Sequence, residues 1–188
     1  MNRTFCTLLI AYSLSFSAAA LDSYTIDPRQ TFPSIQITQL GMAIPLGRFN
    51  QTRGKMYLDP VAATGRIELA IATASISTGL ASLEAHLRSP VLLDAEHYPD
   101  IVFVSDKLTF TNKQLVAADG ALTLHGVTKP VHVDIHAFHC GMNPVAMQDT
   151  CDANASISIK RSDFGVDKYV PIIADQANIA MQISAIKD

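Results

Sequence analysis

Apolar residues recur at every second position in run after run along most of this chain. In one such run, Val131, Val133 and Ile135 alternate with two polar residues. This alternation is typical of β-strands with one buried face, because successive side chains of a strand point to opposite faces of the sheet. The other runs are residues 35–37, 66–72, 101–105, 122–124, 156–160 and 179–184. We therefore expect an all-β fold of about eight strands.

Turn residues separate the alternating runs at short, regular spacing. Asp59-Pro60, Gly65, Asp119-Gly120 and Gly126 each fall between two of them. Short strands joined by such turns predict an antiparallel sandwich or a closed barrel. A single stretch departs from the pattern: Leu80, Leu83 and Leu87 lie at helical spacing and are followed by Ser89-Pro90. This spacing predicts one short helix that ends before the proline.

Residues 1–20 have the features of a secretory signal peptide. Arg3 supplies the positive charge, residues 5–16 are mostly apolar, and Ala18, Ala19 and Ala20 provide a small-residue cleavage site. The apolar run of about 12 residues is too short to span a bilayer of roughly 30 Å as a helix. We therefore expect a cleaved signal over residues 1–20, export of the mature chain, and a single domain over residues 21–188.

The chain has three cysteines, and the first, Cys6, lies within the predicted signal. No lipobox precedes Cys6, so we expect no lipid anchor. Cys140 and Cys151 remain, at the two ends of a loop that contains Gly141, Asn143 and Pro144. Two cysteines in an oxidising compartment favour a disulfide, here one that joins two neighbouring strands. Free thiols or a pair of metal ligands stay open as the alternative.

Composition excludes several classes of protein. Hydrophobic residues make up 48% of the chain and charged residues 16%, which allows a large core and argues against disorder. The formal net charge is −3, so there is no basic surplus for a nucleic-acid partner. Beyond the signal, no segment is long and apolar enough to anchor the chain in a membrane. A homodimer is compatible with the sequence.

Metal and catalytic sites find little support. His132 and His136 lie four residues apart on a predicted strand, about 13 Å at ~3.3 Å per residue, and cannot share one ion. No His-Glu-x-x-His, Cys-x-x-Cys, Gly-x-Ser-x-Gly or dinucleotide-binding motif occurs. We therefore predict no catalytic residue, no metal ligand and no cofactor. A barrel enzyme that acts on a small hydrophobic substrate stays open as the alternative, as does a rigid interaction module with a filled core.

Two motifs carry a resemblance to a known family. Residues 120–131 (GALTLHGVTKPV) and residues 161–165 (RSDFG) resemble the YceI-like family of lipid-binding proteins. Further matching pieces occur in the family's order at residues 24–27, 47–49, 75–79, 86–89 and 98–103. The resemblance implies a lipocalin-like, eight-stranded antiparallel barrel that is exported to the periplasm. The chain departs from many family members in carrying Arg29, Gln30 and Gln39 where they carry histidine.

The inward face of the barrel has two possible uses. The alternation by itself favours a core filled with side chains, whereas the resemblance implies an elongated apolar cavity that holds a polyisoprenoid chain, such as the tail of a quinone. On that basis we expect a non-enzymatic periplasmic binding protein for such a lipid. The expected lining residues are Ile67, Leu69, Ile71, Phe103, Leu122, Leu124, Ile157, Ile159, Met181 and Ile183.

Overall fold

The computed structural model describes residues 21–39, 42–59, 61–144 and 147–188. The predicted signal peptide lies outside these residues. Strands dominate the described part of the chain, with one α-helix, α1 (Ala81–Arg88), and two 3-10 helices, η1 (Thr73–Ser75) and η2 (Arg161–Phe164). The strands are β1 (Asp22–Ile26), β2 (Phe32–Gln39), β3 (Met42–Phe49), β4 (Thr52–Asp59), β5 (Thr64–Ala72), β6 (Ile76–Ser77), β7 (Asp100–Thr111), β8 (Gln114–Leu124), β9 (Val127–Asn143), β10 (Gln148–Lys160) and β11 (Ile173–Lys187).

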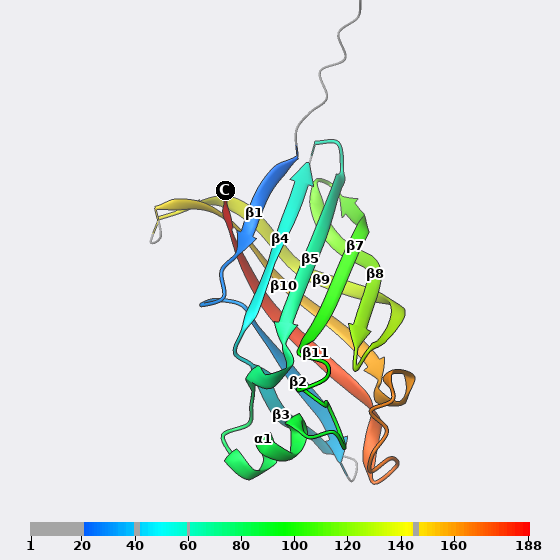
Figure 1. Ribbon diagram of the computed structural model, residues 1–188. Helices are drawn as coiled ribbons and strands as arrows, with labels where there is room; N and C mark the ends of the chain where they lie inside the picture. Colours follow the sequence, from blue (N-terminus) through cyan, green and yellow to red (C-terminus); the bar gives the residue numbers. More distant parts are fainter. Residues whose placement is uncertain (1–20, 40–41, 60, 145–146) are drawn as a thin grey trace, which may run out of the picture.

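Eight of these strands form a closed antiparallel ring, which confirms the predicted barrel (Figure 1). The ring runs in the order β1, β4, β5, β7, β8, β9, β10 and β11, and β11 pairs back onto β1. Closure leaves no open sheet edge around most of the wall, and it directs one face of every strand toward the barrel interior. The period-two pattern therefore separates inside from outside.

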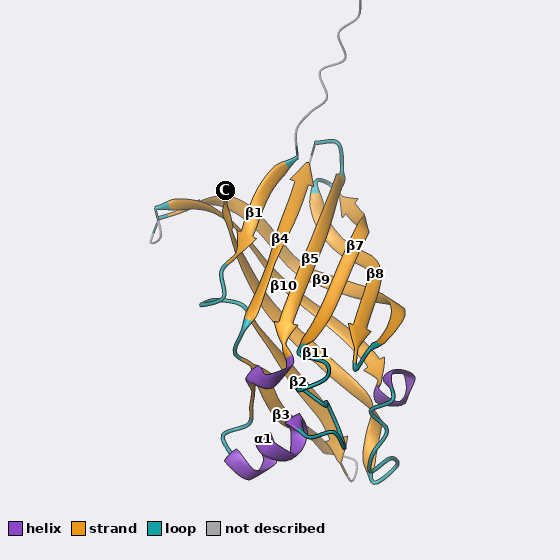
Figure 2. Cartoon of the chain, in the orientation of Figure 1, coloured by secondary structure: helices purple, strands orange, loops and turns teal. Residues whose placement is uncertain are grey.

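Strand β11 is long enough to pair with two strands in succession. Its last residues pair with β1, and its earlier residues pair with β2, so that β1 and β2 together form one interrupted side of the barrel. Strand β2 continues to β3, and β3 pairs with β6, which precedes α1. Figure 2 shows α1 and both 3-10 helices at the same end of the barrel, which we call the helix end; the opposite end is the far end.

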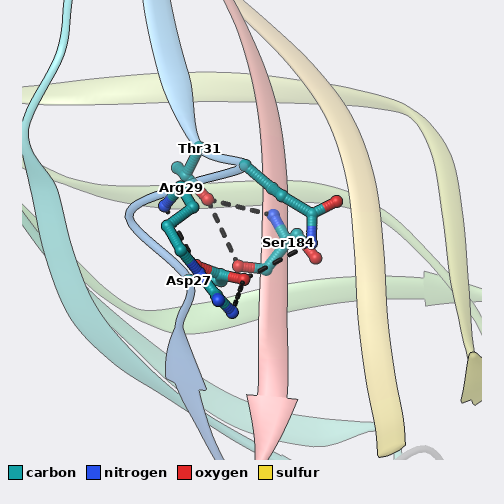
Figure 3. A network of polar contacts seen from close by, with 5 residues as sticks. Asp27, Arg29, Thr31 and Ser184 are labelled. Atoms are coloured by element: carbon teal, nitrogen blue, oxygen red, sulfur yellow. Dashed lines mark hydrogen bonds and ion pairs between the residues drawn. The ribbon is translucent and has the colours of Figure 1, made fainter. Parts of the chain in front are cut away.

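The interruption between β1 and β2 is held against β11 at Ser184 (Figure 3). The backbone N–H of Asp27 and the hydroxyl of Thr31 both donate to the Ser184 carbonyl, at 2.8 and 3.2 Å. Arg29 donates to the Asp27 carboxylate from its backbone and from its guanidinium, each at 2.9 Å. These hydrogen bonds lower the pKa of Asp27 to about 2. Arg29, one of the departures from the family pattern, thus has a structural contact here.

The predicted helix is present as α1 and ends at Ser89, directly before Pro90. Leu87 is its buried residue and faces the barrel. The Glu84 carboxylate accepts hydrogen bonds from the backbone N–H groups of Thr78 and Gly79, at 2.8 and 3.1 Å. These bonds fix the segment that leads from β6 into the helix.

The predicted disulfide is also present, between Cys140 of β9 and Cys151 of β10. The two residues lie directly opposite each other in the antiparallel pairing, with 4.0 Å between their Cα atoms. The bridge therefore joins the two arms of the hairpin near the far end of the barrel, as the loop between the cysteines predicted.

Buried apolar side chains inside the barrel form two clusters. The helix-end cluster consists of Ile37, Phe49, Ile71, Ile76, Leu87, Leu92, Ile101, Leu122, Leu124, Ile159, Phe164, Val166 and Ala177. The far-end cluster consists of Tyr24, Ile26, Met56, Leu58, Ile67, Leu69, Leu115, Ala118, Cys151, Ala155, Ile183 and Ala185. Together the two clusters draw on every ring strand except β9, whose partly buried side chains pack against both, so they hold the wall in its closed form.

Candidate functional site

An apolar cavity of about 170 Å³ lies inside the barrel. Of the 29 residues that line it, only Ser156 and Arg161 are polar. The cavity is surrounded mainly by the helix-end cluster and reaches the border of the far-end cluster. A space of this kind offers a guest almost no hydrogen-bonding partners, so what it can provide is shelter of apolar surface from water.

All ten residues that we expected to line a cavity lie on its wall: Ile67, Leu69, Ile71, Phe103, Leu122, Leu124, Ile157, Ile159, Met181 and Ile183. They come from β5, β7, β8, β10 and β11, so five strands of the ring contribute. This is a statement about position, and their contact with a ligand stays a prediction.

The sequence pattern missed the part of the wall that is not made of ring strands. Leu87 of α1 and Leu92 and Leu93 of the following segment line the cavity at the helix end. Leu46 and Phe49 of β3 line it as well. Leu87 carried a signal, because it belongs to the apolar stripe of the predicted helix, but nothing local showed that this stripe packs across the barrel interior.

The far end of the barrel is filled. Seven of the twelve buried residues in the far-end cluster do not line the cavity: Tyr24, Ile26, Met56, Leu58, Leu115, Cys151 and Ala185. Leu58 is 1% exposed and Ala185 is fully buried, and both belong to this far-end cluster without bordering the cavity. The cavity therefore ends inside the barrel instead of passing through it.

Arg161 is the charged residue on the cavity wall, and its guanidinium is fully engaged with the protein backbone. It donates to the carbonyl oxygens of Ala174, Val166, Lys168 and Ile173, at distances of 2.9 to 3.3 Å. Burial lowers the pKa of Arg161 from its ordinary value. The side chain thus has a structural role, because it fastens the loop between η2 and β11 through backbone carbonyls.

The family-like motif at residues 120–131 forms the end of β8, a tight turn and the start of β9. Gly126 has a φ of +73°, and a Cβ there would collide with the ring of Tyr98, so the turn requires glycine. Gly165 has the same φ and ends η2. Pro130, although proline is common in turns, lies within β9, opposite Ala121.

The outer face of β9 carries the histidines considered above. His132 Nδ1 lies 2.7 Å from Asp119, and His136 Nε2 lies 2.6 Å from the Ser156 hydroxyl, so each has a separate partner on a neighbouring strand. Among the described residues, no three His, Cys, Asp or Glu side chains gather where they could hold a metal ion. The described part of the chain also contains no helix long and apolar enough to cross a membrane.

Comparison with known proteins gives a family. Residues 24–185 match the family described as YceI-like domain. A UPF0312 protein from Vibrio campbellii is 33% identical over 140 residues, which cover 73% of this chain and 74% of that protein. A UPF0312 protein from Pseudomonas putida is 29% identical over 170 residues and covers 88% of each chain.

Solved structures show the same fold. BcnA of Burkholderia cenocepacia superposes with a TM-score of 0.72 at 24% identity, covering 85% of this chain and 98% of that one. A polyisoprenoid binding domain from Saccharophagus degradans superposes with a TM-score of 0.63 at 14% identity, covering 89% and 99%. At these identities the likeness concerns the fold of the chain.

Proposed function

The chain belongs to the YceI-like domain family, and from this premise we propose that it is an exported binding protein for a polyisoprenoid or similar lipid chain. An isoprenoid quinone is the type of ligand we expect. The barrel cavity holds the tail without transforming it. The observation that carries the proposal is the cavity itself, in which 27 of 29 lining residues are apolar. The solved polyisoprenoid binding domain with the same fold adds support.

The energetics of such a site come from apolar surface removed from water. Burial contributes ~0.8 kcal/mol per CH₂ group, so two to three isoprene units give about 8–12 kcal/mol before costs. Loss of translational and rotational freedom on association removes several kcal/mol of this gain. Micromolar or tighter binding therefore needs a tail longer than a single unit.

The size of the cavity adds a requirement. Its volume of about 170 Å³ is close to the ~150 Å³ of an engineered apolar cavity that takes up one benzene ring. Without rearrangement the cavity thus accommodates roughly one isoprene unit. A longer tail enters as lining side chains change rotamer, and Met181, with its unbranched and flexible side chain, is the lining residue best suited to move.

The wall of the cavity favours binding over catalysis. Arg161 is already bonded to four backbone carbonyls, and Ser156 shares its hydroxyl with His136 on the outer face. Neither side chain is arranged as an acid, base or nucleophile toward a guest in the cavity. A bound lipid would therefore leave the site chemically unchanged.

Export forms the second part of the proposal. Residues 1–20 serve as the cleaved signal peptide, and residues 21–188 form the binding domain in the periplasm. The Cys140–Cys151 disulfide supports this location, because such bonds persist in oxidising compartments.

The direct test is to purify the mature protein from its native compartment, extract it with organic solvent and identify the extract by mass spectrometry. We expect an intact isoprenoid in a molar amount close to that of the protein. An extract without lipid, from protein that also fails to take up added isoprenoid, would refute the proposal. N-terminal sequencing of the same sample tests the cleavage after Ala20.

A further inference from the structure

The barrel wall is divided between β9 and β10 at the helix end. The two strands pair from Asn143 and Gln148 as far as Asp134 and Ser156. Beyond that point residues 127–133 of β9 pair only with β8, and residues 157–160 of β10 pair only with β11 (Figure 1). The wall is therefore not closed by strand pairing here.

Side chains close this division instead. Helix η2 follows β10 directly and contacts both β9 and β10. Phe164 of η2 is 2% exposed and packs with Ile159 and Val131 in the helix-end cluster. Since side chains change rotamer far more readily than strands unpair, this part of the wall can open at lower cost than any fully paired part.

A surface hollow of about 500 Å³ lies directly outside the division. Ile159 and Phe164 are buried residues that border it, and Ile159 also lines the inner cavity, so the two spaces share this side chain. Lys129 of β9 and Lys160 of β10 border the hollow from its two sides. Pro130 fits this edge of β9, because a strand that lacks a neighbour on one side tolerates the missing N–H.

The charges around the hollow favour an anion. Within the described residues, neither Lys129 nor Lys160 has a carboxylate within ion-pair distance, unlike Lys55, Lys107 and Lys187. The charge of Lys160 does contribute to lowering the pKa of Asp175. Asp163 also borders the hollow, and His132 borders it but is paired with Asp119 and Asp134. The Gln176 amide, which donates to the Ser158 hydroxyl at 2.7 Å, adds neutral hydrogen-bonding groups.

We propose that this hollow is a binding site for a phosphate or carboxylate group, held between Lys129 and Lys160. The inference rests on the proposed function where it adds that the anion is the head group of the lipid whose tail fills the cavity. It narrows that ligand to an isoprenoid with an anionic head, such as a polyprenyl phosphate, in place of the quinone, whose head is neutral. The division between β9 and β10 then serves as the passage that connects head and tail. An anion in the hollow gains charge-assisted hydrogen bonds from the ammonium groups of the two lysines that border it.

The test compares three probes on the mature protein by calorimetry: farnesyl phosphate, farnesol and inorganic phosphate. Variants are the double substitution Lys129→Gln with Lys160→Gln, and Lys113→Gln as the control. Lys113 is an exposed lysine in the turn between β7 and β8 and borders neither space. We expect the wild-type protein and the control to bind farnesyl phosphate about tenfold more tightly than farnesol, and the double variant to bind both alike.

The outcomes separate the two proposals. Equal binding of farnesol and farnesyl phosphate by the wild-type protein, with no change in the double variant, would overturn the anion site and leave lipid binding intact. Binding of inorganic phosphate that is lost in the double variant supports the anion site and identifies free phosphate as a sufficient ligand. If neither farnesyl compound nor phosphate binds, both proposals fail.

Discussion

The two ends of the barrel use the same alternating pattern and reach different results. Twelve of the thirteen buried residues in the helix-end cluster line the cavity, and Phe164 is the exception. In the far-end cluster only five of the twelve do. Both sets consist mostly of aliphatic side chains that are buried to a similar degree. Burial of an alternating face therefore does not distinguish a filled core from a lined cavity.

What differs is how each end is closed. At the far end, Tyr24 of β1 and Leu58 of β4 lie on neighbouring strands, and they share a buried cluster with small residues such as Ala185. At the helix end the wall is extended by β2, β3 and β6, and α1 and η2 close it from outside the ring. The cavity lies beneath α1, whose Leu87 lines it, whereas most buried side chains of the far-end cluster border no part of the cavity.

The largest expected effect tests this contrast with the same leucine-to-alanine substitution made separately at each end. Leu58→Ala should lower the free energy of unfolding by about 4 kcal/mol, because the far end has no existing space and a new cavity must form. Leu122→Ala should cost about 2 kcal/mol, because Leu122 already lacks packing partners on its cavity side. Urea unfolding with both m-values measured decides the comparison.

Equal losses for Leu58→Ala and Leu122→Ala would contradict the distinction between a packed and a hollow end. A greater loss of unfolding free energy for Leu122→Ala would mean that the helix end is the more tightly packed of the two. Farnesol binding adds a second readout. The folded Leu58→Ala variant should keep the wild-type affinity for farnesol, whereas the affinity of the Leu122→Ala variant should change.

Removal of the disulfide tests the far end alone. The double substitution Cys140→Ala with Cys151→Ala should lower the free energy of unfolding by about 3 kcal/mol, because the unfolded chain gains freedom in the loop between the two cysteines. Cavity binding by the folded variant should stay unchanged. Thiol counting on the denatured, unreduced mature protein should find no free thiol, and two free thiols would show that the bridge does not form.

A small-to-large pair tests whether the space at the helix end is real. Ala185→Leu in the filled far end should destabilise the protein by about 2 kcal/mol through overpacking. Ala177→Leu should be tolerated with a smaller loss, because Ala177 borders the cavity, and should weaken farnesol binding about tenfold by occupying it. A tolerated Ala185→Leu, or an Ala177→Leu variant that binds normally, would argue against the assigned boundary.

Much of this arrangement could be predicted from the sequence, because the features concerned depend on residues that are close together in the chain. Whether Leu122 and Leu124 point inward depends on alternation within β8, and the end of α1 depends on Ser89 and Pro90. The disulfide was predictable for the same reason, because one hairpin joins its two cysteines.

The rest depends on contacts between distant segments. The pairing of β11 with both β1 and β2, and the separation of β9 from β10 after Ser156, are set by strand register across the ring. Pro130 shows the consequence. Proline usually indicates a turn, but it fits within β9 because the strand has lost one neighbour there, and no nearby residue reveals that loss.

The smallest expected effect concerns the junction between the two ends, where the turn between β1 and β2 is fixed to β11. The pKa of Asp27 is lowered from 3.8 to about 2 by Arg29, so the folded state favours the ionised carboxylate. This contribution is complete above about pH 4 and is lost as the pH falls toward 2. Because Arg29 is exposed to solvent, screening reduces the contribution to about 1 kcal/mol.

Asp27→Asn should therefore lower the free energy of unfolding by about 1 kcal/mol at pH 7, and the difference from the wild-type protein should vanish near pH 2. Asp106→Asn, which alters an exposed carboxylate on β7, is the matched control and should leave stability unchanged at both pH values. The measurement is urea unfolding from pH 7 down to pH 2. Asp27→Asn keeps the backbone N–H that donates to the Ser184 carbonyl, so a difference that persists at pH 2 would mean that the Asp27 side chain acts by a route other than its charge.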